Sequence, residues 1–318
     1  MGGAYDKRKD LFMKKVEIIG AAIADVLVTP AEEEVFYTGS YAADDIVMSY
    51  GGDAFNEATV LQCTGVPVHL ETVIGNDEIG KMICRRMDEI GLEKSGVHIK
   101  EDISTSINVV LVKKDGERCF LTNPQGSQRK LKLEDICMPF PKEIDILCFA
   151  SIFVFPQMKT EEMKLVFSQA KSQGIIVCAD MTKCKNKETT ADLAPALQYV
   201  DYLLPNQEEA MLLTRTNTVE DAAKELLHAG VGTVIIKCGS KGCFIKTKEE
   251  EFWMPPSSKV QVVDSTGAGD SFVGGFLYGL ANGFSLKECV QHANGFGAKA
   301  VQKIGATTWI TESKKDKE

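Results

Sequence analysis

The 318-residue sequence contains few of the residues that build metal centres. It has only four histidines, and none of its ten cysteines belongs to a Cys-x-x-Cys pair. Zinc and iron–sulfur sites are therefore not expected, because both need clustered sulfur or imidazole ligands. Scattered cysteines in a chain of this size favour reduced, mostly buried thiols, which predicts a cytoplasmic protein.

Long apolar runs and an excess of positive charge are also missing. The longest apolar stretch, residues 18–28, contains Gly20 and Asp25 and is too short to span a bilayer. The net charge of −9 disfavours nucleic acids and anionic membranes as partners. We therefore expect small-molecule partners, and an anionic one would need a local positive pocket.

Strand-like and helix-like segments alternate along most of the chain. Short apolar runs typical of buried strands occur at 16–19, 68–73, 144–150, 174–179, 202–204 and 233–237. Amphipathic segments between them, such as 77–90 and 160–173, predict helices. This order predicts an α/β fold whose mainly parallel sheet is covered by helices on both faces.

Two segments interrupt this alternation. Residues 26–50 and 97–121 contain strand patterns without a helix, and we expect them to form a small β-sheet lid over the active face. The polar segments 1–12 and 312–318 are expected to be flexible, which leaves a single domain at 13–311.

The segment 264–272, Asp-Ser-Thr-Gly-Ala-Gly-Asp-Ser-Phe, is the most informative part of the chain. Its glycines allow a tight bend whose N–H groups point at one place, and the helix pattern that follows adds a partial positive charge. Such a turn predicts a site for phosphate or another anion. A carboxylate beside it, Asp270, is better suited to accept a proton than to bind phosphate. This combination predicts phosphoryl transfer to a hydroxyl group.

Other phosphate-binding motifs are absent. No P-loop pattern of Gly, four residues and Gly-Lys-Ser/Thr occurs. A dinucleotide fingerprint would need glycine at position 272, where Phe272 stands, and would lie in the first strand–helix turn. A nicotinamide-dependent dehydrogenase is therefore disfavoured.

The segment 51–56, Gly-Gly-Asp-Ala-Phe-Asn, brings glycines next to hydrogen-bonding side chains. Gly51 and Gly52 permit close backbone approach, and Asn56 can both donate and accept. Together with Asp25 they suit a polyol, although a tight turn that caps a helix is an equally good interpretation.

Polar residues also follow two predicted strands. Asn206 and Glu209 could hold Mg²⁺ through water, whereas an ordinary acidic helix start is the simpler interpretation. The segment 237–242, Lys-Cys-Gly-Ser-Lys-Gly, could border a nucleotide or form a plain turn. Asn294 could lie in a nucleobase slot or serve helix packing.

Taken in this order, these segments resemble the ribokinase-like, or PfkB, carbohydrate kinases. The resemblance covers residues 15–310, and the string at 264–272 is its most specific part. The strings at 51–58, 105–108, 178–181 and 200–203 look like a bacterial branch around the sugar kinase YdjH. At 180–183 the chain has Asp-Met-Thr-Lys, where many fructokinases of the family have Asp-Pro-Asn-x-Arg, and this departure speaks against a simple fructokinase.

The resemblance implies a ribokinase-like three-layer α/β/α fold with a lid, and an ATP-dependent sugar kinase activity. Asp270 would be the general base, and the anion hole would consist of Gly267, Ala268 and Gly269. The implied sugar-binding residues are Asp25, Gly51, Gly52, Asn56 and Asn108. The implied ATP-binding residues are Asn206, Lys237, Gly239, Gly242 and Asn294. Asn206 and Glu209 would hold Mg²⁺ through water. A monovalent cation such as K⁺ would lie beside Asp264, Thr266, Ala300, Lys303 and Gly305.

The acceptor stays open, between a ketose and a keto sugar acid. Lys183, Arg118 and Arg129 are cations outside the motifs, and one of them facing the acceptor would indicate a carboxylate on the sugar. We count Lys183 among the substrate-binding residues, although it could instead touch the ATP phosphates. Each of these cations could also be a solvated surface charge.

Two alternatives to a sugar kinase stay open. A nucleoside kinase would need an aromatic wall, for which Phe36, Tyr37 and Phe55 are the candidates. A non-catalytic sugar sensor would not need Asp270 or an anion hole. Lid sheets of the resembled family often pair between subunits, so a homodimer is also expected.

Overall fold

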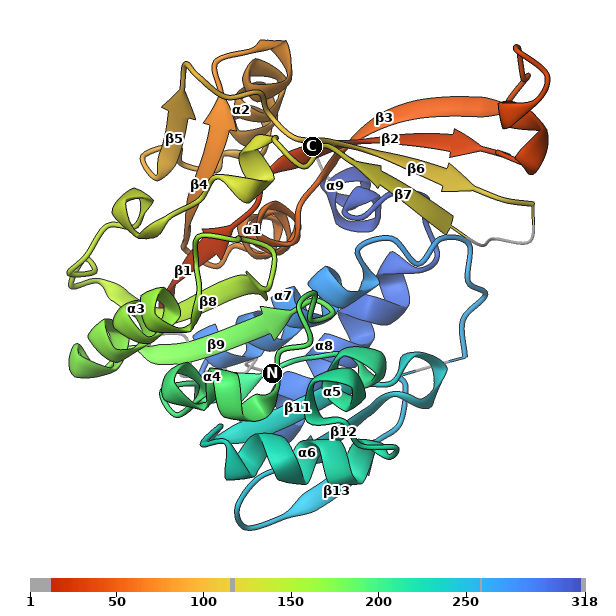
Figure 1. Ribbon diagram of the computed structural model, residues 1–318. Coiled ribbons are helices and arrows are strands. Elements are labelled where there is room, and N and C mark those ends of the chain that lie inside the picture. The colour runs from red at the N-terminus through yellow and green to blue at the C-terminus, as the bar shows by residue number, and fades with distance from the viewer. Residues whose placement is uncertain (1–12, 115–117, 258, 316–318) are drawn as a thin grey trace, which may run out of the picture.

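The computed structural model describes residues 13–114, 118–257 and 259–315, and a nine-stranded sheet forms its centre (Figure 1). In spatial order the strands are β13 (Glu251–Met254), β12 (Cys243–Lys246), β11 (Thr233–Lys237), β10 (Tyr202–Leu203), β9 (Ile176–Met181), β8 (Ile144–Ile152), β1 (Lys15–Gly20), β4 (Val68–Gly75) and β5 (Val97–Lys100). The strands from β11 to β5 are parallel, and β12 and β13 add an antiparallel edge.

Helices cover both faces of the sheet. One core cluster joins it to α3 (Thr160–Ser172), α4 (Thr190–Leu197), α5 (Gln207–Thr214) and α6 (Val219–His228). A second cluster, on the other face, joins it to α1 (Asp53–Thr64), α2 (Glu78–Ile90), α7 (Ala268–Ala281) and α8 (Leu286–Ala300). The prediction of a three-layer α/β/α fold is therefore confirmed.

The central strand β8 shows why the sheet strands are almost continuously apolar. Ile146 and Cys148 enter one core cluster, whereas Leu147 and Phe149 enter the other. Successive side chains of a strand point to opposite faces, so a strand buried on both faces needs apolar residues at every position.

The lid is a four-stranded sheet that extends away from the body, in the order β3-β2-β6-β7 (Figure 1). Its strands are β2 (Ile23–Thr29), β3 (Asp45–Gly51), β6 (Ile107–Val112) and β7 (Arg118–Thr122). The small lid sheet was predicted correctly, but its second segment, 97–121, began too early. Val97–Lys100 is β5, which pairs in parallel with β4 at the edge of the large sheet, because α2 forms the crossover between these two strands.

The last helix corrects a second boundary. The predicted flexible tail, 312–318, begins inside α9 (Thr308–Lys315), which packs against α1 and α8. Residues 1–12 and 316–318, also predicted to be flexible, lie outside the described residues. Within the described part of the chain, no helix has both the length and the apolar character needed to cross a membrane.

Candidate active site

The turn that begins α7 is shaped by one glycine. Gly267 caps the helix with a left-handed backbone, φ +69° and ψ 7°, and a Cβ at this position would collide with Ala306. The first turn then contains Ala268, Gly269 and Asp270, whose backbone N–H groups have no acceptor within the helix. Ala268 donates its N–H to Ser265 O over 3.3 Å, so Gly269 and Asp270 supply the first-turn amides best placed for an anion.

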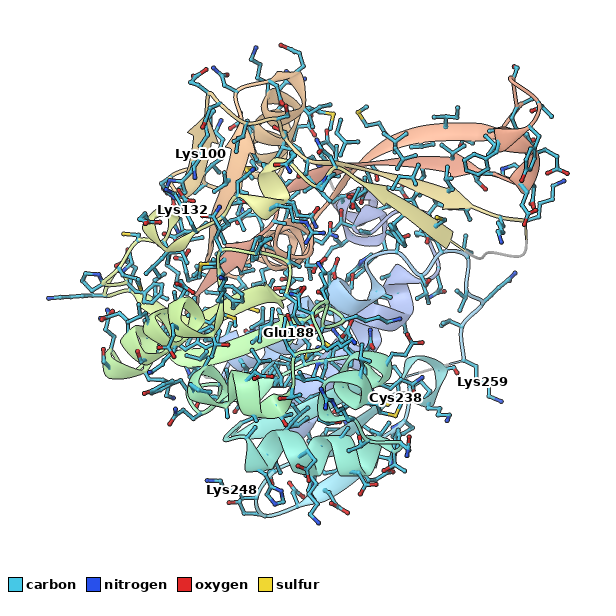
Figure 2. The ribbon with its side chains drawn as sticks, viewed as in Figure 1. Lys100, Lys132, Glu188, Cys238, Lys248 and Lys259 are labelled. Atoms are coloured by element: carbon cyan, nitrogen blue, oxygen red, sulfur yellow. The ribbon has the colours of Figure 1, made fainter. Side chains whose placement is uncertain are left out.

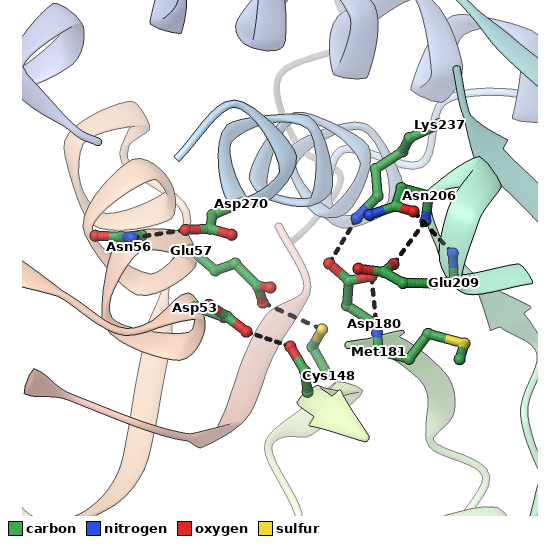
Figure 3. A network of polar contacts seen from close by, with 11 residues as sticks. Asp53, Asn56, Glu57, Cys148, Asp180, Met181, Asn206, Glu209, Lys237 and Asp270 are labelled. Carbon is green, nitrogen blue, oxygen red and sulfur yellow. Dashed lines mark hydrogen bonds and ion pairs between the residues drawn. The ribbon is translucent and has the colours of Figure 1, made fainter. Parts of the chain in front are cut away.

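Asp270 is buried and lies beside α1. Its Oδ2 accepts a 2.6 Å hydrogen bond from the side-chain amide of Asn56 (Figure 3). Burial is the largest influence and raises the pKa of Asp270 well above its ordinary value, and the nearby Asp53 carboxylate raises it further. The Asn56 hydrogen bond and the Lys237 ammonium act in the opposite direction. A carboxylate with a raised pKa is suited to general-base chemistry near neutral pH.

The predicted sugar-binding residues meet at the base of the lid. Gly52 has φ +94°, and a Cβ there would collide with Ala21 O; a Cβ on Gly51 would collide with the Asp25 carboxylate. Asp25 on β2 is paired across the lid with Asn108 on β6.

Two polar atoms in this group are unsatisfied among the described residues. Oδ1 of Asp25 and Oδ1 of Asn108 are buried and have no hydrogen-bond partner among the described residues. Burial raises the pKa of Asp25 to about 6, against the opposing effect of its hydrogen bond with Asn108. Unpaired buried oxygens are costly, so hydroxyl groups of a ligand would stabilise them.

Asn206 and Glu209 form a reciprocal cap on α5. Asn206 Oδ1 accepts from the Glu209 N–H over 2.9 Å, and Glu209 Oε2 accepts from the Asn206 N–H over 2.8 Å. Burial raises the pKa of Glu209 to about 7, and Lys237 opposes this. The cap keeps these oxygen ligands together at the end of a parallel strand, and they fit Mg²⁺ bound through water.

A cavity of about 550 Å³ opens beside the α7 turn. Four of the predicted ATP-binding residues line it: Lys237, Gly239, Gly242 and Asn294. Gly269 of the α7 turn also lines it. Asn294 is buried, and its amide donates to Pro255 O over 3.1 Å, so it also holds the strand-to-helix connection in place. Lys259, labelled in Figure 2, lines the same cavity. The volume suits a small molecule with a phosphate end near Gly269.

Residues 13–313 match the model of the pfkB family of carbohydrate kinases. The chain belongs to this family. It is therefore a phosphotransferase with an alcohol group as acceptor, and ATP binding follows from the family.

Several known proteins resemble this PfkB kinase over most of its length. Fructoselysine 6-kinase of Escherichia coli is 26% identical over 80% of this chain and 91% of that protein. The 2-dehydro-3-deoxygluconokinase of Haemophilus influenzae is 25% identical over 92% of this chain and 95% of that protein. The structure of Arabidopsis thaliana ribokinase complexed with ribose and ATP has a TM-score of 0.78 at 25% identity, covering 93% of this chain and 95% of that one. The likeness to the YdjH branch stays a prediction.

The residues predicted to surround a monovalent cation in this PfkB kinase are linked in two groups by hydrogen bonds. Asp264 Oδ1 accepts from the N–H and the hydroxyl of Thr266, both over 2.8 Å, and its Oδ2 accepts from the Gly305 N–H over 2.8 Å. Ala300 is buried at the end of α8. The Lys303 N–H donates to Ala300 O over 3.2 Å, and the Lys303 side chain pairs with Glu312 over 3.3 Å. The cation site stays a prediction.

Lys183 lies in the loop that follows β9. Its ammonium pairs with Glu208 on α5 over 2.6 Å, and both side chains are more than half exposed. Glu208 is the neighbour of Glu209, so this lysine lies near the residues predicted to hold Mg²⁺. The assignment of Lys183 to the substrate-binding residues therefore stays a prediction.

Three acidic residues of the site had no predicted role. Asp53 accepts a hydrogen bond from the Ser151 hydroxyl, and the buried Glu57 accepts from the Cys148 thiol over 3.3 Å. Asp180 Oδ2 accepts a 2.6 Å bond from the Lys237 ammonium (Figure 3). Asp180 could have been found, because it directly follows the predicted strand 174–179, and the carboxyl ends of parallel strands share one edge of the sheet.

Proposed function

We propose that this PfkB kinase transfers the γ-phosphoryl group of ATP to a hydroxyl of a monosaccharide, a ketose or a keto sugar acid. The supporting observation is the position of Asp270. Its carboxylate accepts a hydrogen bond from Asn56, which belongs to the proposed sugar-binding group, and Asp270 itself belongs to the first turn of α7, whose Ala268 and Gly269 line the cavity.

In this proposal each group has a distinct task. Asp25, Asn56 and Asn108 hold the sugar hydroxyls, and Asp270 takes the proton from the hydroxyl that is phosphorylated. The turn formed by Gly267, Ala268 and Gly269 holds the transferred phosphoryl, chiefly through the N–H groups of Gly269 and of Asp270 after it, and the lid excludes water. Most of the acceleration then comes from positioning and charge stabilisation.

ATP would occupy the cavity lined by Gly239, Gly242 and Asn294, with its phosphates toward Gly269. Mg²⁺ held through water by Asn206 and Glu209 would neutralise charge on the phosphates. A monovalent cation beside Asp264 is a further proposal, supported by the 2.8 Å bond that ties this residue to Gly305.

The names of two relatives and the exposure of three aromatic side chains support this substrate class. Two relatives are named for a fructose derivative and for a keto sugar acid. Of the three candidates for a nucleobase wall, Phe55 is 1% exposed within the core, and Phe36 and Tyr37 are 74% and 83% exposed. No observation on these aromatics favours a nucleoside acceptor over a sugar.

We further propose a homodimer formed through the lid. Its strands expose apolar side chains on Ile46 and Met48 of β3 and on Phe120 and Leu121 of β7, each more than half exposed. Such a surface is typical of an interface. Because ATP is consumed and scattered cysteines suit a reducing compartment, the cytosol is the proposed location.

A screen of ATP consumption tests this function. Ketoses, keto sugar acids and nucleosides are offered in turn to the wild-type protein and to Asp270→Asn. We expect turnover with one of the first two classes and a loss of at least about 10²–10⁴-fold in the variant, with ATP binding retained. Near-normal turnover in Asp270→Asn would remove the general base from the proposal, and turnover with nucleosides alone would replace the acceptor.

A further inference from the structure

Lys237 connects three elements that surround the proposed phosphate site. It ends β11, and its N–H donates to Pro205 O over 2.8 Å, directly before Asn206 of the α5 cap. Its ammonium lies 2.6 Å from Asp180 Oδ2 at the end of β9. On the third side, a Cβ built on Gly269 would lie 3.6 Å from the Lys237 Nζ, so the ammonium rests against the first turn of α7.

This lysine is the one cation among the labelled residues of Figure 3. The carboxylates drawn in the same view belong to Asp53, Glu57, Asp180, Glu209 and Asp270. Glu209 and Asp270 both influence the ammonium electrostatically, so each is a possible partner besides Asp180. A flexible four-carbon side chain needs a fixed partner to stay in one of these positions.

Asp180 supplies that fixed partner. Its Oδ1 accepts a 2.8 Å bond from the Met181 N–H, which orients the carboxylate, while Oδ2 accepts from Lys237. The two side chains are only 6% and 13% exposed. A buried ion pair contributes little net stability compared with apolar residues of similar size. Stability alone therefore does not explain why a buried ion pair occupies this position.

We propose that Asp180 is a positioning residue, which holds the Lys237 ammonium against Gly269 to bind the phosphoryl group in transfer and keeps it away from Asp270. A lysine has three donors, so the bond to Asp180 leaves donors for phosphate oxygens. An ammonium beside the turn would stabilise the charge of the migrating group. The same ammonium paired with Asp270 would hinder the base. This inference rests on the proposed function, because it takes Asp270 as that base.

Two substitutions separate these roles. Lys237→Met removes the phosphate contact, so ATP affinity should fall about tenfold or more while adenosine affinity stays unchanged. Asp180→Asn frees the lysine to approach Asp270 or Glu209, so kcat should fall about tenfold or more with little change in the KM of the acceptor. In the Lys237→Met background Asp180→Asn should have no further effect on kcat, because no ammonium is left to misplace.

The experiment combines calorimetric binding of ATP and adenosine with steady-state kinetics on the full chain. The matched control is Lys171→Met, which breaks the 2.8 Å pair with Asp201 near the other end of β9 and should leave both measurements unchanged. If a single variant fails to fold, the double variant Asp180→Asn/Lys237→Met, which leaves no unpaired buried charge, provides the ratio of ATP to adenosine affinity.

A ratio about tenfold below that of the wild type supports the inference, and an unchanged ratio overturns it. Additive losses of kcat in the double-mutant cycle overturn the positioning role of Asp180. Failure of the proposed function looks different: the wild-type protein would then turn over no acceptor, while the comparison of ATP with adenosine would still report on Lys237.

Discussion

The side-chain amide of Asn56 donates a 2.6 Å hydrogen bond to the carboxylate of Asp270, which lies 214 positions away in the sequence. This bond joins the start of α1 to the start of α7 at the point where both helices leave a glycine turn. Two motifs that looked separate in the sequence therefore form one site, and each now affects the chemistry expected of the other.

The Asn56–Asp270 bond predicts a change in the pH profile. The bond lowers the pKa of Asp270, so Asn56→Ala should raise it further. A general base acts in its ionised form, so the acidic limb of the kcat/KM profile should move to higher pH. Asn282→Ala, which removes an amide that donates to Tyr278 O at the far end of α7, is the control. A limb that stays in place would show that Asp270 is not the titrating base.

The α7 turn predicts that Gly267 cannot be replaced. Gly267→Ala would combine a left-handed backbone with a collision against Ala306, so the anion hole should be lost and turnover should fall at least about 100-fold. Gly283→Ala is the matched control, because Gly283 has φ +71° but nothing within 4 Å of an added Cβ. It should cost roughly 1 kcal/mol of stability, measured by urea unfolding, and leave turnover intact. Equal activity in the two variants would contradict the prediction.

A buried carboxylate far from the site predicts how stability depends on pH. Glu71 is 2% exposed, and burial, followed by repulsion from Glu17, raises its pKa from 4.5 to about 7. The folded state therefore binds more protons than the unfolded state between these values, so this contribution is present at pH 4.5 and lost as the pH rises through 7. Glu71→Gln should flatten the decline, with a gain of roughly 2–3 kcal/mol at pH 8 relative to its effect at pH 5.

Urea unfolding at pH 5 and pH 8 measures this difference. The control is Glu134→Gln, whose side chain is 74% exposed and should leave the slope of stability against pH unchanged. A wild-type protein as stable at pH 8 as at pH 5, with no flattening in Glu71→Gln, would refute the assignment.

The exposed lid surface predicts an effect on association. Ile46→Lys places a charge on β3, where Ile46 is 66% exposed, and should dissociate the proposed homodimer in sedimentation velocity. Leu212→Lys is the control, because Leu212 on α5 is 48% exposed but lies outside the lid. If Ile46→Lys sediments as the wild type does, the dimer either does not form or uses another surface.

Most of the architecture could be predicted from the sequence. Alternating strand and helix patterns predicted the three-layer fold, because strands buried on both faces must be apolar at nearly every position. One exception was Val97–Lys100, whose short pattern suits a lid strand as well as an edge strand. Only the crossover through α2 places this segment beside β4. The end of α9 was missed for a similar reason, since a charged segment fits a short terminal helix or a free tail.

By itself, the sequence determined the kind of chemistry: a glycine turn before a helix specifies its own backbone conformation locally, and Asp270 follows within three residues of Gly267. The tertiary structure alone decided which side chains act together. Asp180 meets Lys237 across 57 residues, and Asn56 meets Asp270 across 214, because parallel strands and the helices after them bring their ends to one edge of the sheet. Partners this distant depend on packing, which no local pattern encodes.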